Sequence, residues 1–144
     1  MKRLLIILLL ITSFSTIAQT EEDCSGSYYF LIEAKDGHIL DYKMQLNPDK
    51  TFVYTSFNRV VDMRGNHDTT KKGKGTWKVE NKIIKFTTEL KDLDQDHTLN
   101  FTGTTARIVK KSPRDTSDKV VPTALQFYKS EIRTIENLKF LLKV

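Results

Sequence analysis

Alternation of apolar and polar residues constrains this chain more than any other feature of its sequence. It is clearest in residues 39–46, whose even positions are Leu40, Tyr42, Met44 and Leu46 and whose intervening positions are Asp41, Lys43 and Gln45. Side chains alternate between the two faces of a β-strand, so this period of two predicts a strand with one buried and one solvated face.

The same pattern recurs along the chain between short turns. The Asn47–Lys50 stretch suits a tight turn because Pro48 presets its backbone angle, so segments 39–46 and 51–58 should form a hairpin. Further strands are expected at 27–35, 74–79, 82–88, 98–102, 105–110, 123–129 and 138–144. We expect a hairpin around Asn81, a hairpin around Gly103, burial of both faces of 27–35, and at most one short helical turn in 130–137. The result is an all-β, antiparallel meander of about eight strands, forming a barrel or half-barrel.

The N-terminus has the order of a signal peptide. Lys2 and Arg3 precede an apolar run from Leu4 to Ile11, and small or hydroxylated residues lead to Ala18. We expect cleavage after Ala18, a flexible tail over 19–25 and a β domain over 26–144, located outside the cytoplasm as a secreted or periplasmic protein. A tethered form is the weaker alternative, and no transmembrane segment is expected in the mature chain. Removing Lys2 and Arg3, and no acidic residue, lowers the formal charge from +5 to +3.

Cys24 is the only cysteine, so the chain cannot form an internal disulfide bond. We expect a thiol on the flexible tail or one that pairs with another molecule. A lipid anchor is disfavoured, because the charged residues Glu21, Glu22 and Asp23 precede Cys24 where a lipoprotein signal has small or apolar residues.

Two stretches carry a resemblance to a known family. The run Leu46-Asn47-Pro48-Asp49-Lys50-Thr51-Phe52 and the Gly75-Thr76-Trp77 that opens a later hairpin are similar to the exported lipocalin-like domains of bacteria. The resemblance covers residues 26–88, with Lys50 where glycine is usual and Tyr28 where classical lipocalins carry tryptophan. It implies an antiparallel barrel or half-barrel whose cavity holds a small apolar molecule.

Catalytic and metal-binding patterns are missing from the sequence. His38, His67 and His97 lie in expected turns or loops, and no Gly-x-Ser-x-Gly motif accompanies them, so we expect no enzyme activity. The 92–96 run has alternating aspartates, but His97 and Gly103 replace the glycine and glutamate of a calcium loop, which favours a solvated turn. No metal and no cofactor are expected.

Basic residues also have an ordinary explanation. Interleaved acids and the small net charge favour a solvated face over a nucleic-acid site for Lys71, Lys72, Lys74, Lys110, Lys111 and Arg114. No nucleic-acid partner is expected.

The inward positions define the candidate site. They are Tyr42, Met44, Phe52, Tyr54, Trp77, Phe86, Phe101 and Phe127. An eight-stranded barrel can be packed solid or hold one small ligand, so these residues are either core or the lining of a site. We predict an exported, non-catalytic protein that binds a small apolar or amphipathic ligand in the barrel. The alternative is a protein-interaction module of the envelope or extracellular space, with a solid core, acting through long loops at 59–72 and 112–122.

Overall fold

The computed structural model describes residues 23–144. The predicted leader, residues 1–18, and the first part of the predicted tail, residues 19–22, lie outside the described residues. Within 23–144, no helix has the length and apolar character needed to cross a membrane.

Nine strands and one short 3₁₀ helix make up the described chain. They are β1 (Gly26–Glu33), β2 (Ile39–Leu46), β3 (Thr51–Asp62), β4 (Gly65–Glu80), β5 (Ile83–Thr87), η1 (Leu90–Asp92), β6 (His97–Leu99), β7 (Thr105–Val109), β8 (Ala124–Lys129) and β9 (Lys139–Leu142).

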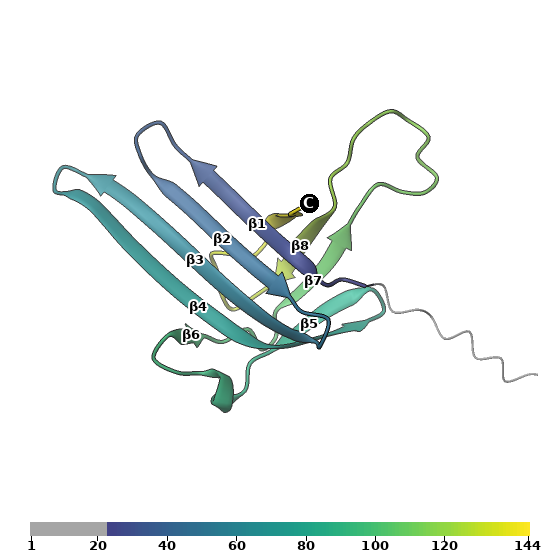
Figure 1. Ribbon diagram of the computed structural model, residues 1–144, viewed down its shortest axis with the longest axis horizontal. Coiled ribbons are helices and arrows are strands. Elements are labelled where there is room, and N and C mark those ends of the chain that lie inside the picture. The colour runs from purple at the N-terminus through teal and green to yellow at the C-terminus, as the bar shows by residue number, and fades with distance from the viewer. Residues whose placement is uncertain (1–22) are drawn as a thin grey trace, which may run out of the picture.

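Eight of these strands close into an antiparallel barrel (Figure 1). The order runs β3-β2-β1-β9-β8-β7-β5-β4, and β4 returns to pair with β3. The short β6 adds to β4 in parallel. The predicted all-β barrel is therefore confirmed, and its shape is consistent with the lipocalin-like resemblance.

The strands β1 to β4 are long, and β3 and β4 form a hairpin that projects past the rest of the barrel (Figure 1). This corrects the predicted loop at 59–72. The register continues through Arg59↔Asp68 to Asp62↔Gly65, and Arg59 Nε lies 2.7 Å from Asp68 Oδ1. Gly65, with φ of 116°, allows the tight turn. Most of the projecting part is exposed on both faces, so the sequence carries no alternation there.

The predicted hairpin around Gly103 is also wrong. β6 pairs with β4, whereas β7 pairs with β5 and β8. The segment between β5 and β7 is held by threonines instead: Thr88 Oγ1 accepts a hydrogen bond from the Phe101 N–H at 3.0 Å and donates one to the Lys74 carbonyl at 3.1 Å. These bonds seat the Phe101 ring in the core, where it is fully buried.

Two other connections contain turns. The 112–122 stretch is a loop, as predicted, with a turn in which the Asp115 N–H donates to the Ser112 carbonyl. The 130–137 stretch contains successive turns and no helix, within the expected limit of one short helical turn, and these turns bury Ile135. The Thr104 and Ser130 hydroxyls, 2.9 Å apart and buried, tie this stretch to the segment that carries Phe101.

The start of the domain is more tightly held than a flexible tail. Cys24 is 3% exposed and belongs to the hydrophobic core, and its carbonyl accepts a hydrogen bond from the Tyr28 hydroxyl at 2.8 Å. This corrects the expectation of a thiol on a flexible tail.

Candidate functional site

The eight residues predicted to face inward are all buried and are brought together in the barrel. Each is at most 3% exposed. Their inward orientation is confirmed. The alternation in β2, β3, β4, β5 and β8 places seven of them, whereas Phe101 lies outside the strands and is placed by the bond of its N–H to Thr88.

Aromatic rings fill the barrel by touching one another. Phe101 packs edge-on against Phe52 and Tyr54, with ring centroids 5.0 and 5.1 Å apart. Phe127 packs in the same way against Phe140 at 5.1 Å, and Phe86 joins the two groups. These separations are those of favourable aromatic pairs in a core. The described rings therefore pack as a core.

Trp77 has a separate role near the turn between β2 and β3. Its indole N–H donates to the Thr51 carbonyl at 3.0 Å, and the Lys50 ammonium lies 4.2 Å from its ring centroid. Lys50 occupies the turn position with a φ of 69°, where glycine would be usual. The cation–π contact gives this lysine a stabilising role in the turn.

Two buried polar atoms in the barrel lack hydrogen-bond partners among the described residues: the Tyr54 hydroxyl and Asn58 Oδ1. Burial raises the pKa of Tyr54 well above its usual range. Burial also raises the pKa of Tyr42, and a hydrogen bond with the Asn58 side chain partly offsets that rise. Sequence reasoning missed Ser56 and Asn58 here. Ser56 and Asn58 follow Phe52 and Tyr54 at every second position of β3, so extending the alternation along the strand predicts that they face inward too.

A groove of about 470 Å³ lies against β1 and β2. Its lining is Ser27, Tyr28, Tyr29, Leu31, Asp41, Lys43, Met44, Gln45 and Lys143. Tyr29 and Leu31 are 36% and 48% exposed, which corrects the expectation that both faces of the first strand are buried.

The polar side chains around the groove are mostly paired with one another. Lys43 Nζ lies 2.8 Å from Asp41 Oδ2, and the Ser27 hydroxyl donates to Gln45 Oε1. Lys143, which follows β9, adds a second ammonium group, and its backbone N–H donates to the Ser27 carbonyl at 2.8 Å. The groove thus combines an apolar surface with two cationic side chains.

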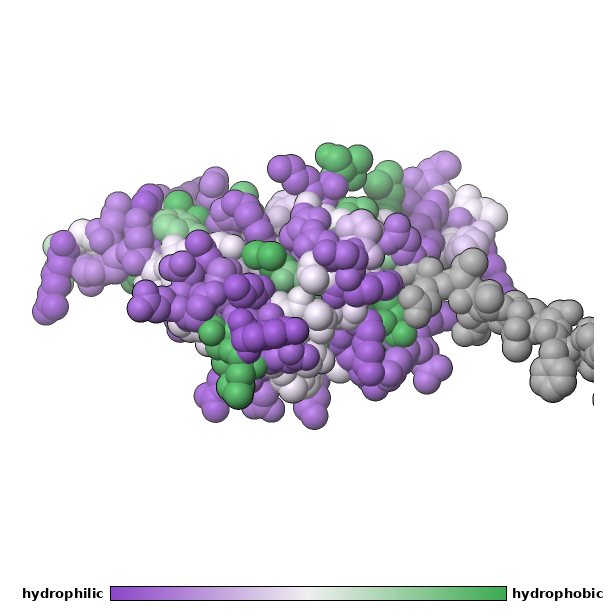
Figure 2. Space-filling model, turned by 60° about the horizontal axis from the view of Figure 1, so that its bottom comes forward, coloured by the Kyte–Doolittle hydropathy of each residue, from purple (hydrophilic) through white to green (hydrophobic). Residues whose placement is uncertain are grey.

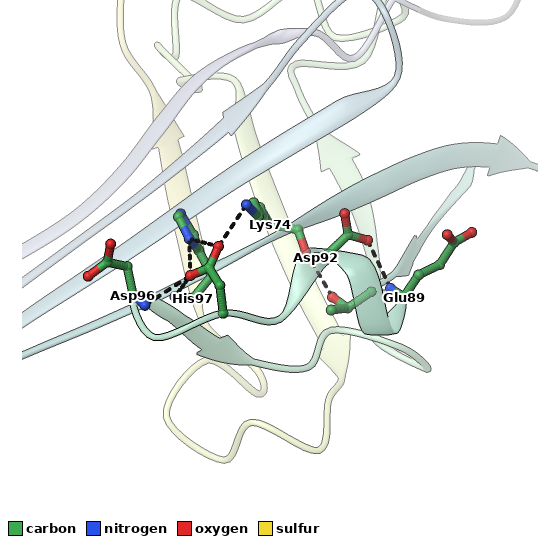
Figure 3. Close-up of polar contacts among 7 residues, drawn as sticks. Lys74, Glu89, Asp92, Asp96 and His97 are labelled. Atoms are coloured by element: carbon green, nitrogen blue, oxygen red, sulfur yellow. Dashed lines mark hydrogen bonds and ion pairs between the residues drawn. The ribbon is translucent and has the colours of Figure 1, made fainter.

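The acidic 92–96 run is a folded connection. Lys74 Nζ lies 2.9 Å from Asp94 Oδ2, and His97 Nδ1 lies 2.9 Å from Asp94 Oδ1. Figure 3 shows Lys74 and His97 at this connection. Lys74 and the backbone N–H of His97 hold the pKa of Asp94 far below its usual range. Asp92 accepts a hydrogen bond from the Glu89 N–H. Among residues 23–144, no group of three or more His, Cys, Asp or Glu side chains is placed to hold a metal ion.

The remaining charged side chains are spread over the surface. Lys71, Lys72 and Lys74 lie on β4, whereas Lys110, Lys111 and Arg114 lie between β7 and β8. Each histidine contacts an aspartate: His38 with Asp36, His67 with Asp62, and His97 with Asp94. On the face in Figure 2, hydrophobic residues form separate patches within a mainly hydrophilic surface.

Comparison of the chain with protein-family models, with curated proteins and with solved structures gives no significant match.

Proposed function

We propose that this chain is an exported, non-catalytic protein that binds a small amphipathic molecule, and that the ligand lies in the β1–β2 groove. The observation that carries the proposal is the groove of about 470 Å³ beside a barrel whose aromatic rings already contact one another. Small-molecule sites commonly enclose roughly 300–1,000 Å³. Export rests on the leader pattern in residues 1–18.

The lining indicates the chemistry of the ligand. Tyr29 and Leu31 offer apolar surface to a hydrocarbon body, and Lys43 and Lys143 offer ammonium groups to an anionic end. Lys43 already has Asp41 as an ion-pair partner, so an anion would share or replace that contact. An apolar chain that ends in a carboxylate fits this pattern.

Nuclear magnetic resonance titration with octanoate tests the site, with octanol as the neutral probe. We expect saturable shifts of the Tyr29, Leu31 and Lys43 amide signals, and weaker binding of octanol. Leu31→Asp should remove binding. The matched control Val53→Asp, at a valine that is 42% exposed on β3, should keep it.

The Trp77 indole N–H is an internal reporter, because it lies in the core rather than in the groove. If the titration shifts the Trp77 indole signal and leaves the Tyr29 and Leu31 amide signals unchanged, the ligand binds in the barrel interior and not in the groove. The absence of any saturable shift with either probe would reject the carrier function.

The projecting β3–β4 hairpin favours a second candidate, a protein-interaction module. Met63 at its tip is fully exposed, as is expected of a contact residue and unusual for a large apolar side chain. Val60 and His67 face each other as a hydrogen-bonded pair, the kind that a two-residue turn closes, so residues 61–66 can be replaced by Asn-Gly. This shortened chain should stay folded and bind octanoate, but lose a partner captured by the intact hairpin. A partner retained by the shortened chain would reject the hairpin as the contact.

A further inference from the structure

Strand β1 runs past the strand that flanks it. Its ladder with β9 consists of two residue pairs, Tyr28↔Leu142 and Tyr29↔Leu141, whereas β1 continues to Glu33. Figure 1 shows the far half of β1 extending together with β2 beyond the rest of the barrel. One edge of β1 is therefore not covered by β9 from residue 30 onward.

Two hydrogen bonds fix which backbone groups face this edge. The Ser27 carbonyl accepts from the Lys143 N–H on the β9 side, whereas the Ala34 N–H donates to the His38 carbonyl on the β2 side. Backbone groups of successive residues in a strand point in opposite directions. The N–H and C=O groups of Leu31 and Glu33 consequently point away from β2, to the open edge.

The open edge of β1 lacks the protection that the other projecting edge has. On β4, the stretch 65–72 is polar throughout and ends in Lys71 and Lys72. On β1, the open residues 30–33 are Phe-Leu-Ile-Glu, with no lysine and no proline, and Glu33 at the end of the strand is their one charge. Natural edge strands usually carry lysine, proline or a bulge that prevents pairing with another strand. The same molecule thus protects one edge and leaves the other able to pair.

We propose that the β1 edges of two copies of this chain pair antiparallel about a twofold axis at Ile32. Leu31 then faces Glu33 of the second copy, Glu33 faces Leu31, and the two Ile32 residues face each other. In this register the N–H and C=O groups of Leu31 and Glu33 of each copy all form hydrogen bonds with the other copy. An axis at Leu31 would need the Tyr29 edge, which Leu141 already occupies, and an axis at Glu33 would oppose two carboxylates.

The side chains at the axis support pairing with a second copy. Ile32 is 46% exposed and faces the same side of the sheet as Leu40, its partner on β2. The pair would place four apolar side chains side by side across four strands. Their order is Leu40 and Ile32 of one copy, then Ile32 and Leu40 of the other. Residues that face each other without backbone bonds approach most closely, which favours contact at the axis. Leu31 contributes its backbone to the pair and its side chain to the groove, but the contact at the axis is made by Ile32, which does not line the groove.

The contact is short, so the dimer should be weak and visible only at high protein concentration. Sedimentation velocity of the mature chain from about 10 µM to about 1 mM should show a reversible shift from monomer to dimer. A monomer at all of these concentrations would overturn the proposal.

A charge exchange at the axis tests the register. Ile32→Lys and Ile32→Glu should each abolish the dimer, since equal charges would then face each other. An equal mixture of the two variants should restore it as a heterodimer, at least tenfold tighter than either variant alone. Val53→Lys is the control, because it places the same charge at a similarly exposed β-branched residue on β3.

Other outcomes reject the proposal. Dimers that persist in both Ile32 variants would place the contact elsewhere. Folded monomeric variants that do not recombine would overturn the axis at Ile32. Circular dichroism of each variant verifies the fold. If either Ile32 variant fails to fold, amide hydrogen exchange of the native chain at low and high concentration tests the pairing instead. Slower exchange of the Leu31 and Glu33 amides at higher concentration supports the pairing, and unchanged exchange of these amides rejects it.

Discussion

Gly73 lies so close to Phe101 that a Cβ atom added to the glycine would stand 2.6 Å from Cε2 of the ring. We expect Gly73→Ala to cost about 1–3 kcal/mol in the free energy of unfolding, because the buried ring must shift. Gly75→Ala should cost more, since its Cβ would meet the Thr87 carbonyl oxygen at 2.1 Å and the backbone there cannot move freely. Urea denaturation measures both. Equal stability of Gly73→Ala and the native chain would contradict the tight fit.

Thr88 and Thr87 are neighbours on opposite faces of the same stretch and form a matched pair. Thr88→Val leaves the Phe101 N–H without the acceptor that it has at 3.0 Å, so we expect a loss of about 1–3 kcal/mol. Thr87→Val, on the exposed face of β5, should change stability by no more than about 0.5 kcal/mol. The comparison is made by thermal and urea unfolding. Similar effects of the two substitutions would show that Thr88 is not what holds Phe101.

The buried hydroxyls of Tyr54 and Tyr28 should respond in opposite ways to replacement by phenylalanine. Tyr54→Phe removes a buried polar atom without a hydrogen-bond partner, so we expect a gain on the order of 1 kcal/mol. Tyr28→Phe removes the donor to the Cys24 carbonyl and should cost about 1–2 kcal/mol. Denaturant unfolding of the two variants gives the sign. Destabilisation by Tyr54→Phe would mean that its hydroxyl is hydrogen-bonded in solution.

Glu80 should contribute to the acid sensitivity of the fold. Hydrogen bonds from Lys85 and Lys78 lower the pKa of Glu80 from 4.5 to about 2. A lowered pKa stabilises the folded state above pH 4.5, and this contribution is lost as the pH falls from 4.5 to about 2. We expect Glu80→Gln to have a flatter stability profile than the native chain over that range. Because the groups are exposed, 1 M salt should reduce the difference between the two profiles. If the stability of Glu80→Gln and of the native chain changes equally with pH at low salt, Glu80 does not contribute to the acid sensitivity.

Alternation predicted the parts of the barrel in which one face is buried and the other solvated. Phe52 and Tyr54 in β3, and Trp77 in β4, are of this kind. It could not predict the projecting half of the β3–β4 hairpin, because both faces meet solvent there and residues such as Asn66 and Thr69 carry no pattern.

Pairing between distant segments was the second limit. Nothing local to residues 97–99 indicates that they pair with β4, since that position depends on Thr88 and on the space that Gly73 leaves for Phe101. The groove was missed for a related reason. An outward Tyr29 or Leu31 has the same sequence signal as a buried one until the neighbouring strands are known.

The two-pair ladder between β1 and β9 has a consequence for how the barrel forms. Tyr28 lies on the first strand of the barrel and Leu142 on its last strand, so the circle of strands stays open until β9 has reached β1. Until then β1 to β4 can form hairpins, but Phe52, Tyr54 and Trp77 have only part of their eventual neighbours. Such late, long-range closure slows folding and prolongs the time during which apolar surface is exposed. Deleting the last few residues should therefore leave an open curved sheet prone to aggregate, rather than a slightly shorter barrel.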